Sequence, residues 1–294
     1  MNKKPTIIIV FLLLVAIPFW LWVVVPQLTK LSNNFLYKAV IVSLDNFYDE
    51  TQQKYSGEAR SITKFSYEVT EQKQGNLIVK NVFDVRKVTG EKIFVVERLY
   101  GIDPKTGKHV AGFGDKTRDG YLFAPHNLKY GEPFTYWHIN YDGPAHMTFA
   151  GEENLFGLPV YRYETRYEGV KIDQTTNLSF LPEVGVTRGV ILEPYLQLWI
   201  EPISGRLIKY KDNTIAYYYD LKTDERLNPW NHFENRYDPE SVIEQVEIAR
   251  KENFNTKIIK FCVPVLLILF SVIIILFQYH RNKTVKPEAV TIVR

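Results

Sequence analysis

The six histidines could form a metal site only if the fold held several of them in a fixed frame. His126, His138 and His146 fall within 21 residues of one another. No histidine pair has i, i+4 spacing on a predicted helix, and no His-x-His occurs on a predicted strand. Cysteine ligands are also missing from this region. We therefore predict no metal and no cofactor, and we interpret the histidines as surface or loop residues: His109, His126, His138, His146, His232 and His280.

Nucleophilic and acid–base chemistry has equally little support. The chain contains no Gly-x-Ser-x-Gly motif and no Gly-x-x-x-x-Gly-Lys-Ser/Thr phosphate-binding loop. Glu152 and Glu153 are adjacent, so on a strand their side chains point to opposite faces. Asp115 and Asp119 resemble part of a calcium loop, but basic residues stand between them. We predict no catalytic residue and a non-enzymatic role.

Aromatic residues are the remaining chemical signal. Residues 27–257 contain 34 Phe, Tyr and Trp side chains, including the run Tyr217–Tyr219 and the pair Tyr136 and Trp137. One interpretation is an ordinary core with exposed strand tyrosines. The other is an apolar groove that holds a lipid or another hydrophobic ligand. The sequence leaves both interpretations open.

Two apolar runs flank the region that carries these residues. Residues 7–25 have no charged or strongly polar side chain, and residues 261–277 form a second run that the preceding isoleucines extend. About 20 helical residues cross a hydrocarbon core of about 30 Å. A cleaved signal peptide is the alternative for the first run, but its apolar part is too long and ends in Trp20 and Trp22. An all-round apolar surface argues against a buried core helix. We predict two membrane spans.

Basic residues flank both spans on the terminal side, which indicates that both termini are cytoplasmic. The predicted location is the plasma membrane. Residues 27–257 have 29 basic and 32 acidic side chains, a net charge of −3, so the +3 of the whole chain comes from the membrane flanks and does not indicate nucleic-acid binding. The predicted regions are a cytoplasmic N-terminus (1–5), a span (6–26), an extracytoplasmic domain (27–257), a second span (258–279) and a basic cytoplasmic tail (280–294).

Alternation with period two dominates the predicted outer domain. Over residues 59–220, apolar positions such as Leu77 and Val79 alternate with polar ones such as Lys80 and Asp84. The links between such segments are short and contain Gly or Pro, which favours antiparallel pairing. The predicted fold class is mainly β, a curved antiparallel sheet or open barrel between N- and C-terminal transmembrane helices.

Two helices are expected beside this sheet. The Asp-Pro-Glu motif at residues 238–240 supplies an N-cap, a proline at the first helical position and an acid in the first turn. We predict a stalk helix over about residues 239–257 that leads into the second span. The mixed pattern of residues 28–44 suggests a partner helix. Because the only cysteine, Cys262, lies in the second apolar run, the outer domain has no disulfide.

Short motifs follow one another in a recognisable order at residues 102–108, 120–125, 134–137, 142, 149–153, 157–163 and 199–205. This order resembles the bacterial porin PorA family over roughly residues 5–280. The resemblance implies two terminal spans, repeated Asp/Glu-Pro-x-x-Gly turns and a Gly-Glu-Glu strand before a Gly-Leu hairpin, in a family of otherwise unknown function. It assigns structural roles to Asp103, Pro104, Gly107, Trp137, Asp142, Gly151, Glu152, Gly157, Pro202 and Gly205.

One spacing departs from the family pattern. Residues 138–141 separate Trp137 from Asp142, where the resemblance leads us to expect the acid nearer the tryptophan. We therefore expect no local role for that pair.

Two functional hypotheses follow. The first is a membrane-anchored, non-enzymatic binding domain for a lipid or other apolar ligand. The alternative is a sensory or structural subunit that couples the outer domain to a membrane protein such as a kinase or transporter. Channel activity is not expected, because the strand pattern is too short and polar for a membrane barrel and neither span has a polar stripe to line water. The expected partners are the bilayer and one of these molecules, without nucleic acid.

Overall fold

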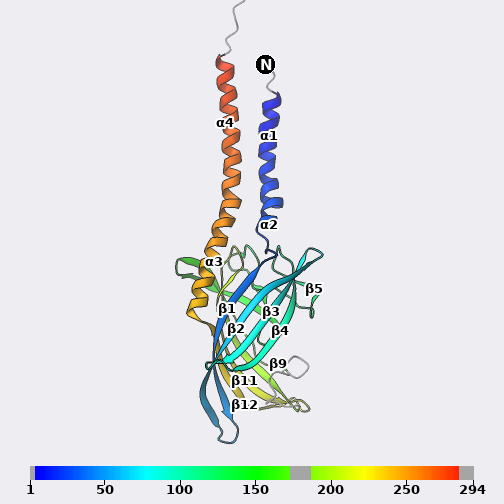
Figure 1. Ribbon diagram of the computed structural model, residues 1–294, viewed down its shortest axis with the longest axis vertical. Helices are drawn as coiled ribbons and strands as arrows, with labels where there is room; N and C mark the ends of the chain where they lie inside the picture. The colour runs from blue at the N-terminus through cyan, green and yellow to red at the C-terminus, as the bar shows by residue number, and fades with distance from the viewer. Residues whose placement is uncertain (1–3, 173–186, 285–294) are drawn as a thin grey trace, which may run out of the picture. The chain divides into compact units, whose positions relative to one another are not determined.

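Residues 4–172 and 187–284 are described by a computed structural model, in which the chain forms two compact units. One unit contains the apolar helices from both ends of the chain, up to Lys30 and from Asn253 onward. The other unit, Leu31–Glu252, is built mainly from β-strands (Figure 1).

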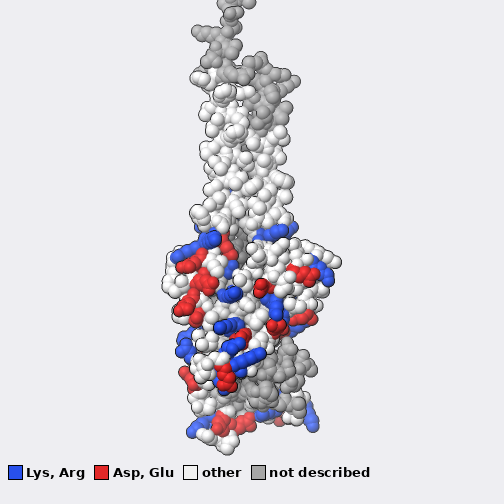
Figure 2. Space-filling model, viewed as in Figure 1, with Lys and Arg blue, Asp and Glu red and all other residues white. Residues whose placement is uncertain are grey.

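Two helical segments are long and apolar enough to cross a membrane, Phe11–Leu28 and Pro239–His280. Figure 2 shows an almost uncharged surface along the apolar helices. Both segments are compatible with a lipid bilayer, as predicted. The helices are α1 (Lys4–Phe19), α2 (Val25–Leu28), α3 (Pro239–Lys257) and α4 (Val263–Thr284), with π-helical turns at Trp20–Val24 and Ile258–Cys262.

A hydrogen bond joins the two π-helical turns within the helical unit. The indole Nε1 of Trp20 donates to the carbonyl oxygen of Ile259 over 2.9 Å. In a π-helical turn a carbonyl accepts from the N–H five residues later, which for Ile259 is Pro264, a residue without an N–H. Trp20 therefore satisfies a carbonyl that would find no partner in a lipid bilayer.

We expect W20F to weaken the pairing of the two helices by about 0.6 kcal/mol, the average for interhelical hydrogen bonds in membranes. Amides of Ile258–Cys262 should then exchange with deuterium about threefold faster in detergent, because the free carbonyl loosens this turn. The matched control is W22F, since Trp22 is 79% exposed. Equal acceleration in both variants would contradict a specific role for the Trp20 hydrogen bond.

The described part of the β unit contains twelve strands in one antiparallel sheet, in the order β5-β4-β3-β2-β1-β12-β11-β10-β8-β7-β6, with β9 beside β10. The strands are β1 (Leu36–Asp49), β2 (Lys54–Lys73), β3 (Asn76–Lys87), β4 (Lys92–Ile102), β5 (His109–Gly114), β6 (Phe134–His138), β7 (Gly143–Leu155), β8 (Leu158–Arg166), β9 (Val170–Ile172), β10 (Arg188–Ile200), β11 (Leu207–Asp220) and β12 (Arg226–Tyr237).

Two meanders make up this sheet. Strands β1 to β5 form one, β6 to β12 form the other, and the β1–β12 pair joins them. Figure 1 shows β1, β2, β3 and β4 side by side. Tight turns connect neighbours as predicted; in the β7–β8 turn both Phe156 and Gly157 have positive φ, 52° and 85°. The predicted fold class, a curved antiparallel sheet or open barrel, is confirmed.

The helix suggested for residues 28–44 is wrong, because most of this segment belongs to β1. Tyr37, Ala39 and Ile41 are buried at every second position, which is the period of a strand. Pairing with β2 on one side and β12 on the other satisfies the backbone of β1. Strand β12 was not predicted, since its sequence is polar and contains Pro229.

A short segment bridges the two edges of the sheet. The N–H of His109, at the start of β5, donates to the carbonyl of Gly120 over 2.9 Å. The N–H of Tyr121 donates to Thr135 in β6 over 2.9 Å, and that of Trp137 returns to Tyr121 over 3.2 Å. The sheet remains open, but these bonds draw its edges together and give the β unit an interior.

Helix α3 begins where the sequence predicts. The N–H of Ser241 donates to the Asp238 carboxylate over 2.8 Å, which is an N-cap. Its apolar face, Val242, Val246 and Ala249, is buried in the same core as the strands. The part of α3 that belongs to the β unit therefore packs on the sheet.

Candidate functional site

The interior of the open barrel has a filled half and a hollow half. Inward side chains of β1 show the change, because Tyr37 and Ile41 are packed in the core whereas Ser43 and Asp45 line a cavity of about 530 Å³. Aromatic side chains fill the other half, and those that are almost completely buried include Tyr37, Tyr67, Tyr100, Tyr136, Tyr163 and Tyr210. The cavity thus ends where this aromatic core begins.

Apolar side chains make up more than half of the described cavity wall. Val88 and Ile93, at the β3–β4 turn, line the cavity and are 57% and 47% exposed, so the cavity opens to solvent there. Aromatic rings give a ligand a large contact area at low entropic cost. Five of them line the wall: Phe47, Phe83, Phe94, Trp230 and Phe233.

Among the described residues of this wall, Asp45 is the one that carries a carboxylate. The amide Nδ2 of Asn231 donates to Asp45 Oδ1 over 2.9 Å, while Asn231 Oδ1 accepts from the N–H of Asn46 over 3.0 Å. Burial raises the pKa of Asp45 above its ordinary value, and the Asn231 hydrogen bond opposes that rise.

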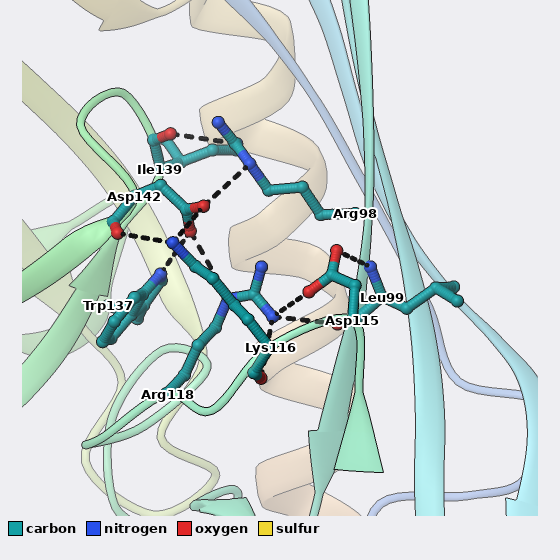
Figure 3. A network of polar contacts seen from close by, with 8 residues as sticks. All are labelled: Arg98, Leu99, Asp115, Lys116, Arg118, Trp137, Ile139 and Asp142. Carbon is teal, nitrogen blue, oxygen red and sulfur yellow. Dashed lines mark hydrogen bonds and ion pairs between the residues drawn. The ribbon is translucent and has the colours of Figure 1, made fainter. Parts of the chain in front are cut away.

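A polar cluster surrounds Asp142 (Figure 3), and its member Arg98 also lines the cavity. Asp142 accepts from Trp137 Nε1 over 2.6 Å and pairs with Lys116 Nζ at 2.7 Å. Arg98 Nε and Arg118 Nε lie farther away, each at 3.4 Å. Asp115 completes the cluster through a 2.5 Å ion pair with Arg118. The Asp142 cluster is thus Arg98, Asp115, Lys116, Arg118, Trp137 and Asp142.

The cluster holds a carboxylate in its charged form despite burial. Burial alone raises the pKa of Asp142, but Arg98 and hydrogen bonds from Lys116 and Trp137 hold it below the ordinary value. Three cations surround two carboxylates, so the cluster has one excess positive charge. Arg98 belongs to both the cluster and the cavity wall.

A second buried carboxylate, Asp212, lies beside the cavity wall. It accepts from Asn140 Nδ2 over 2.8 Å, from Thr214 over 2.6 Å and from the Tyr210 hydroxyl over 3.2 Å. Burial would raise the pKa of Asp212, but a hydrogen bond and the charge of His138 lower it below the ordinary value. Asn140 lines the cavity, so this network fixes part of the wall.

Comparison with known proteins supports the resemblance seen in the sequence. The family model described as Porin PorA matches residues 6–278, which is nearly the whole chain. The chain belongs to the Porin PorA family. No curated protein matches it.

In this member of the Porin PorA family, Trp137 and Asp142 have a local role after all. The intervening residues 138–141 complete β6 and a turn, and Asp142 has φ of 49°. This reversal brings the carboxylate back to the indole N–H of Trp137. We expected no local role for Trp137 and Asp142 because of their separation along the chain. This was wrong, since the turn after β6 brings the two side chains together.

The two Asp/Glu-Pro-x-x-Gly turns of this chain, at residues 103–107 and 201–205, hold one segment between them. Gly107 accepts from the N–H of Leu122 over 3.0 Å, and Pro202 accepts from the N–H of Leu128 over 2.7 Å. Gly205 has φ of 69°, and a Cβ there would lie 2.6 Å from the Ala124 carbonyl oxygen. Within the first turn, the Asp103 carboxylate accepts from Thr106 and the N–H of Lys105, and Pro104 accepts from the N–H of Leu31.

The remaining family positions lie in the β7–β8 hairpin. Gly151 occupies an irregular step in the β7–β8 register, Glu152 is exposed and Gly157 stands in the tight turn. Glu153 points to the other face, where it accepts from Trp199 Nε1 over 2.7 Å. None of the ten family positions is a described lining residue of the cavity; Asp142 approaches it through Arg98.

Two histidines differ from the surface or loop position expected for them. His109 is 7% exposed and His138 is 1% exposed. His109 packs between the rings of Tyr100 and Trp137, with centroids at 5.5 and 6.0 Å. Neither histidine is part of a metal cluster, since no group of three or more possible ligands occurs among the described residues.

We did not predict the charged residues in and beside the cavity wall, although a sequence pattern indicates them. Arg98 precedes Tyr100 by two positions, and Asp212 follows Tyr210 by two, so both side chains point inward. A charged group at an inward position must find a partner or neutralise. A charged residue at a strand position whose neighbours two residues away are buried therefore indicates an internal polar site, and our predictions did not draw on this pattern.

We expect the β unit to lose stability in mild acid because of His109. Burial and then the nearby Arg118 lower the pKa of His109 from 6.5 to about 3. Between pH 6.5 and about pH 3, His109 is protonated in the unfolded chain but not in the folded chain. The free energy of unfolding therefore falls by up to about 1.4 kcal/mol per pH unit as the pH decreases. Burial lowers the pKa of His126 too, with the same sign.

Denaturant unfolding of the full chain in detergent at about pH 7.5 and about pH 5 measures this effect. H109F should reduce the loss by about 2 kcal/mol, since the proton uptake disappears. His146 is exposed, so H146F should keep the wild-type difference. An unchanged pH difference in H109F would contradict the assignment to His109.

Proposed function

We propose that this chain is a membrane-anchored, non-enzymatic binding domain for a lipid or another apolar molecule. The observation that carries the proposal is the cavity of about 530 Å³ inside the open barrel, with its aromatic wall. Ligand cavities typically measure about 300–1,000 Å³ and are mainly apolar with a few polar groups. The wall fits both criteria.

The family name raises the alternative of a pore. The packing of the interior supports a binding role instead. Buried aromatic side chains fill the interior beyond the cavity, among them Tyr136 and Tyr210, which are each 1% exposed. A water-filled channel needs a polar lining along its full length. We therefore propose a cavity that holds a molecule rather than a passage through the sheet.

We further propose that the domain acts outside the cytoplasm, at the plasma membrane, with both termini inside. The basic residues at the chain ends support this orientation. Two anchors keep a binding domain close to the bilayer, which is where an apolar ligand is concentrated. The sensory or structural role stays a hypothesis, and crosslinking that recovers a distinct membrane protein would support it.

Photolabelling tests the binding proposal. The full chain in non-ionic detergent is irradiated with a 16-carbon alcohol that carries a diazirine in its chain. We expect labelled peptides from β3 and β4, including Phe83 and Phe94, and we expect unlabelled hexadecanol to compete with this labelling. Labelling confined to α1 and α4 would overturn the proposal, because the helices also meet detergent.

A further inference from the structure

Charged side chains around the cavity are unequal in sign. Arg60, Lys87 and Arg98 line it, against one carboxyl group among the described lining residues, Asp45. Asp45 already accepts a hydrogen bond from Asn231 at 2.9 Å. Lys87 is paired with Glu91 at 2.8 Å, so Arg60 and Arg98 leave the described wall with one more positive than negative group, which favours an anionic occupant.

Arg98 differs from the other two cations because it is buried. It is 5% exposed, whereas Arg60 and Lys87 are exposed. A guanidinium has five N–H donors. Arg98 Nη1 donates to the Ile139 carbonyl over 3.0 Å, and Nε faces Asp142 Oδ2 in an ion pair at 3.4 Å, so these two contacts involve only two of the five donors. Donor capacity therefore remains at the inner end of the cavity.

Arg98 is not the nearest partner of Asp142. Its carboxylate has closer partners in Trp137, at 2.6 Å, and Lys116, at 2.7 Å, while Arg98 Nε lies 3.4 Å away. The Asp142 cluster has one excess positive charge, and Arg98 is the cluster member that lines the cavity. In a region of low dielectric constant, a cluster with one cation more than its carboxylates attracts an anion strongly.

The cavity wall also changes in polarity along its length. Ser43 and Thr63 line it next to the filled half, where their hydroxyl groups can donate hydrogen bonds. Toward the open end the wall includes Phe47, Phe94 and Val88. The exposed cations Arg60 and Lys87 also line the opening, so the apolar stretch lies between two charged ends and fits an alkyl chain whose single polar end lies at one of them.

We infer that the cavity takes an anionic amphiphile, a single alkyl chain with a carboxylate or phosphate group, whose anionic end lies inward against Arg98. The alkyl chain then lies along the aromatic wall toward the β3–β4 turn. This inference rests on the proposed function and adds the charge and the orientation of the ligand.

Competition against the photoreactive alcohol tests the charge. Hexadecanoate, hexadecyl phosphate, hexadecanol and acetate are each titrated against labelling of β3 and β4 in the full chain. Either anionic amphiphile should compete at roughly tenfold to hundredfold lower concentration than hexadecanol, because a buried guanidinium forms charge-assisted hydrogen bonds with the anion. Acetate should not compete, since it lacks the chain. The stronger of the two anions identifies the headgroup.

Variants test the orientation and correct for partition into micelles. R98Q should remove most of the preference for the anion over the alcohol while labelling persists, and R98K should restore part of it. K87Q and R60Q change exposed cations at the opening and should keep the preference. If K87Q and R60Q abolish the preference and R98Q does not, the anion lies at the opening and the inferred orientation is wrong.

The wild-type chain alone can overturn the inference, whether or not R98Q folds. Equal competition by hexadecanoate, hexadecyl phosphate and hexadecanol would contradict an anionic ligand while leaving the binding domain in place. Loss of all competable labelling in the strands would instead contradict the proposed function itself.

Discussion

Replacing Asp142 by asparagine is expected to destabilise the β unit by about 3–5 kcal/mol, the cost of removing one partner from a buried ion pair. The Asp142 side chain is 2% exposed, and its loss leaves Arg98, Lys116 and Arg118 facing one another without their central anion. Asparagine tolerates the positive φ of 49° at this position, so D142N tests the charge rather than the backbone.

Denaturant unfolding of the full chain in detergent, followed by tryptophan fluorescence, measures this loss. The matched control is E97Q, which removes an exposed ion pair between Glu97 and Lys80 at 2.8 Å. Exposed pairs contribute about 0–1 kcal/mol. A D142N variant that loses no more stability than E97Q would show that the Asp142 cluster contributes little to the fold.

Gly120→Ala is expected to cost about 3 kcal/mol and to loosen the contact between the sheet edges. Gly120 has φ of 74°, and a Cβ there would overlap the carbonyl oxygen of Thr135 in β6. Left-handed backbone costs about 1 kcal/mol for alanine, and forced overlap adds about 1–3 kcal/mol. The Tyr121 amide should also exchange faster, because its hydrogen bond to Thr135 must lengthen.

Gly90→Ala separates these two contributions. Gly90 has φ of 90° in the β3–β4 turn, and a Cβ there would meet nothing within 4 Å. It should therefore cost only about 1 kcal/mol, from the backbone alone. If the two alanine variants lose equal stability and Tyr121 stays protected, the close approach of Gly120 to β6 does not hold the edges together.

Local patterns predicted the strands that alternate clearly, such as β3, where Leu77 and Val79 are buried and Lys80 is not. Local patterns did not predict β1 or β12, two strands that pair with each other although they are far apart in the sequence. Strand β12 has weak alternation, and its strand character depends on the neighbours that supply its hydrogen bonds. A short stretch of sequence does not predict such long-range pairing.

The candidate site was harder to predict than the fold for a related reason. The motifs on which the resemblance to the family rests, such as Asp103 to Gly107, hold turns and loops together and lie away from the described cavity wall. The wall comes from strands in both meanders, so Asp45 and Asn231 meet only after β1 pairs with β12. Aromatic content indicated an apolar site, but position in the sheet decides which rings pack and which line the cavity.

Blocking the cavity tests the central claim most directly. Val96 lines the cavity, whereas its neighbour Val95 is not among the described lining residues, and successive strand side chains point to opposite faces. V96W should reduce competable photolabelling of the β12 peptide that contains Phe233 by at least about tenfold, because the indole would occupy part of the space that a 16-carbon chain needs. V95W should label like the wild-type chain. Undiminished labelling in V96W would contradict a ligand site inside the open barrel.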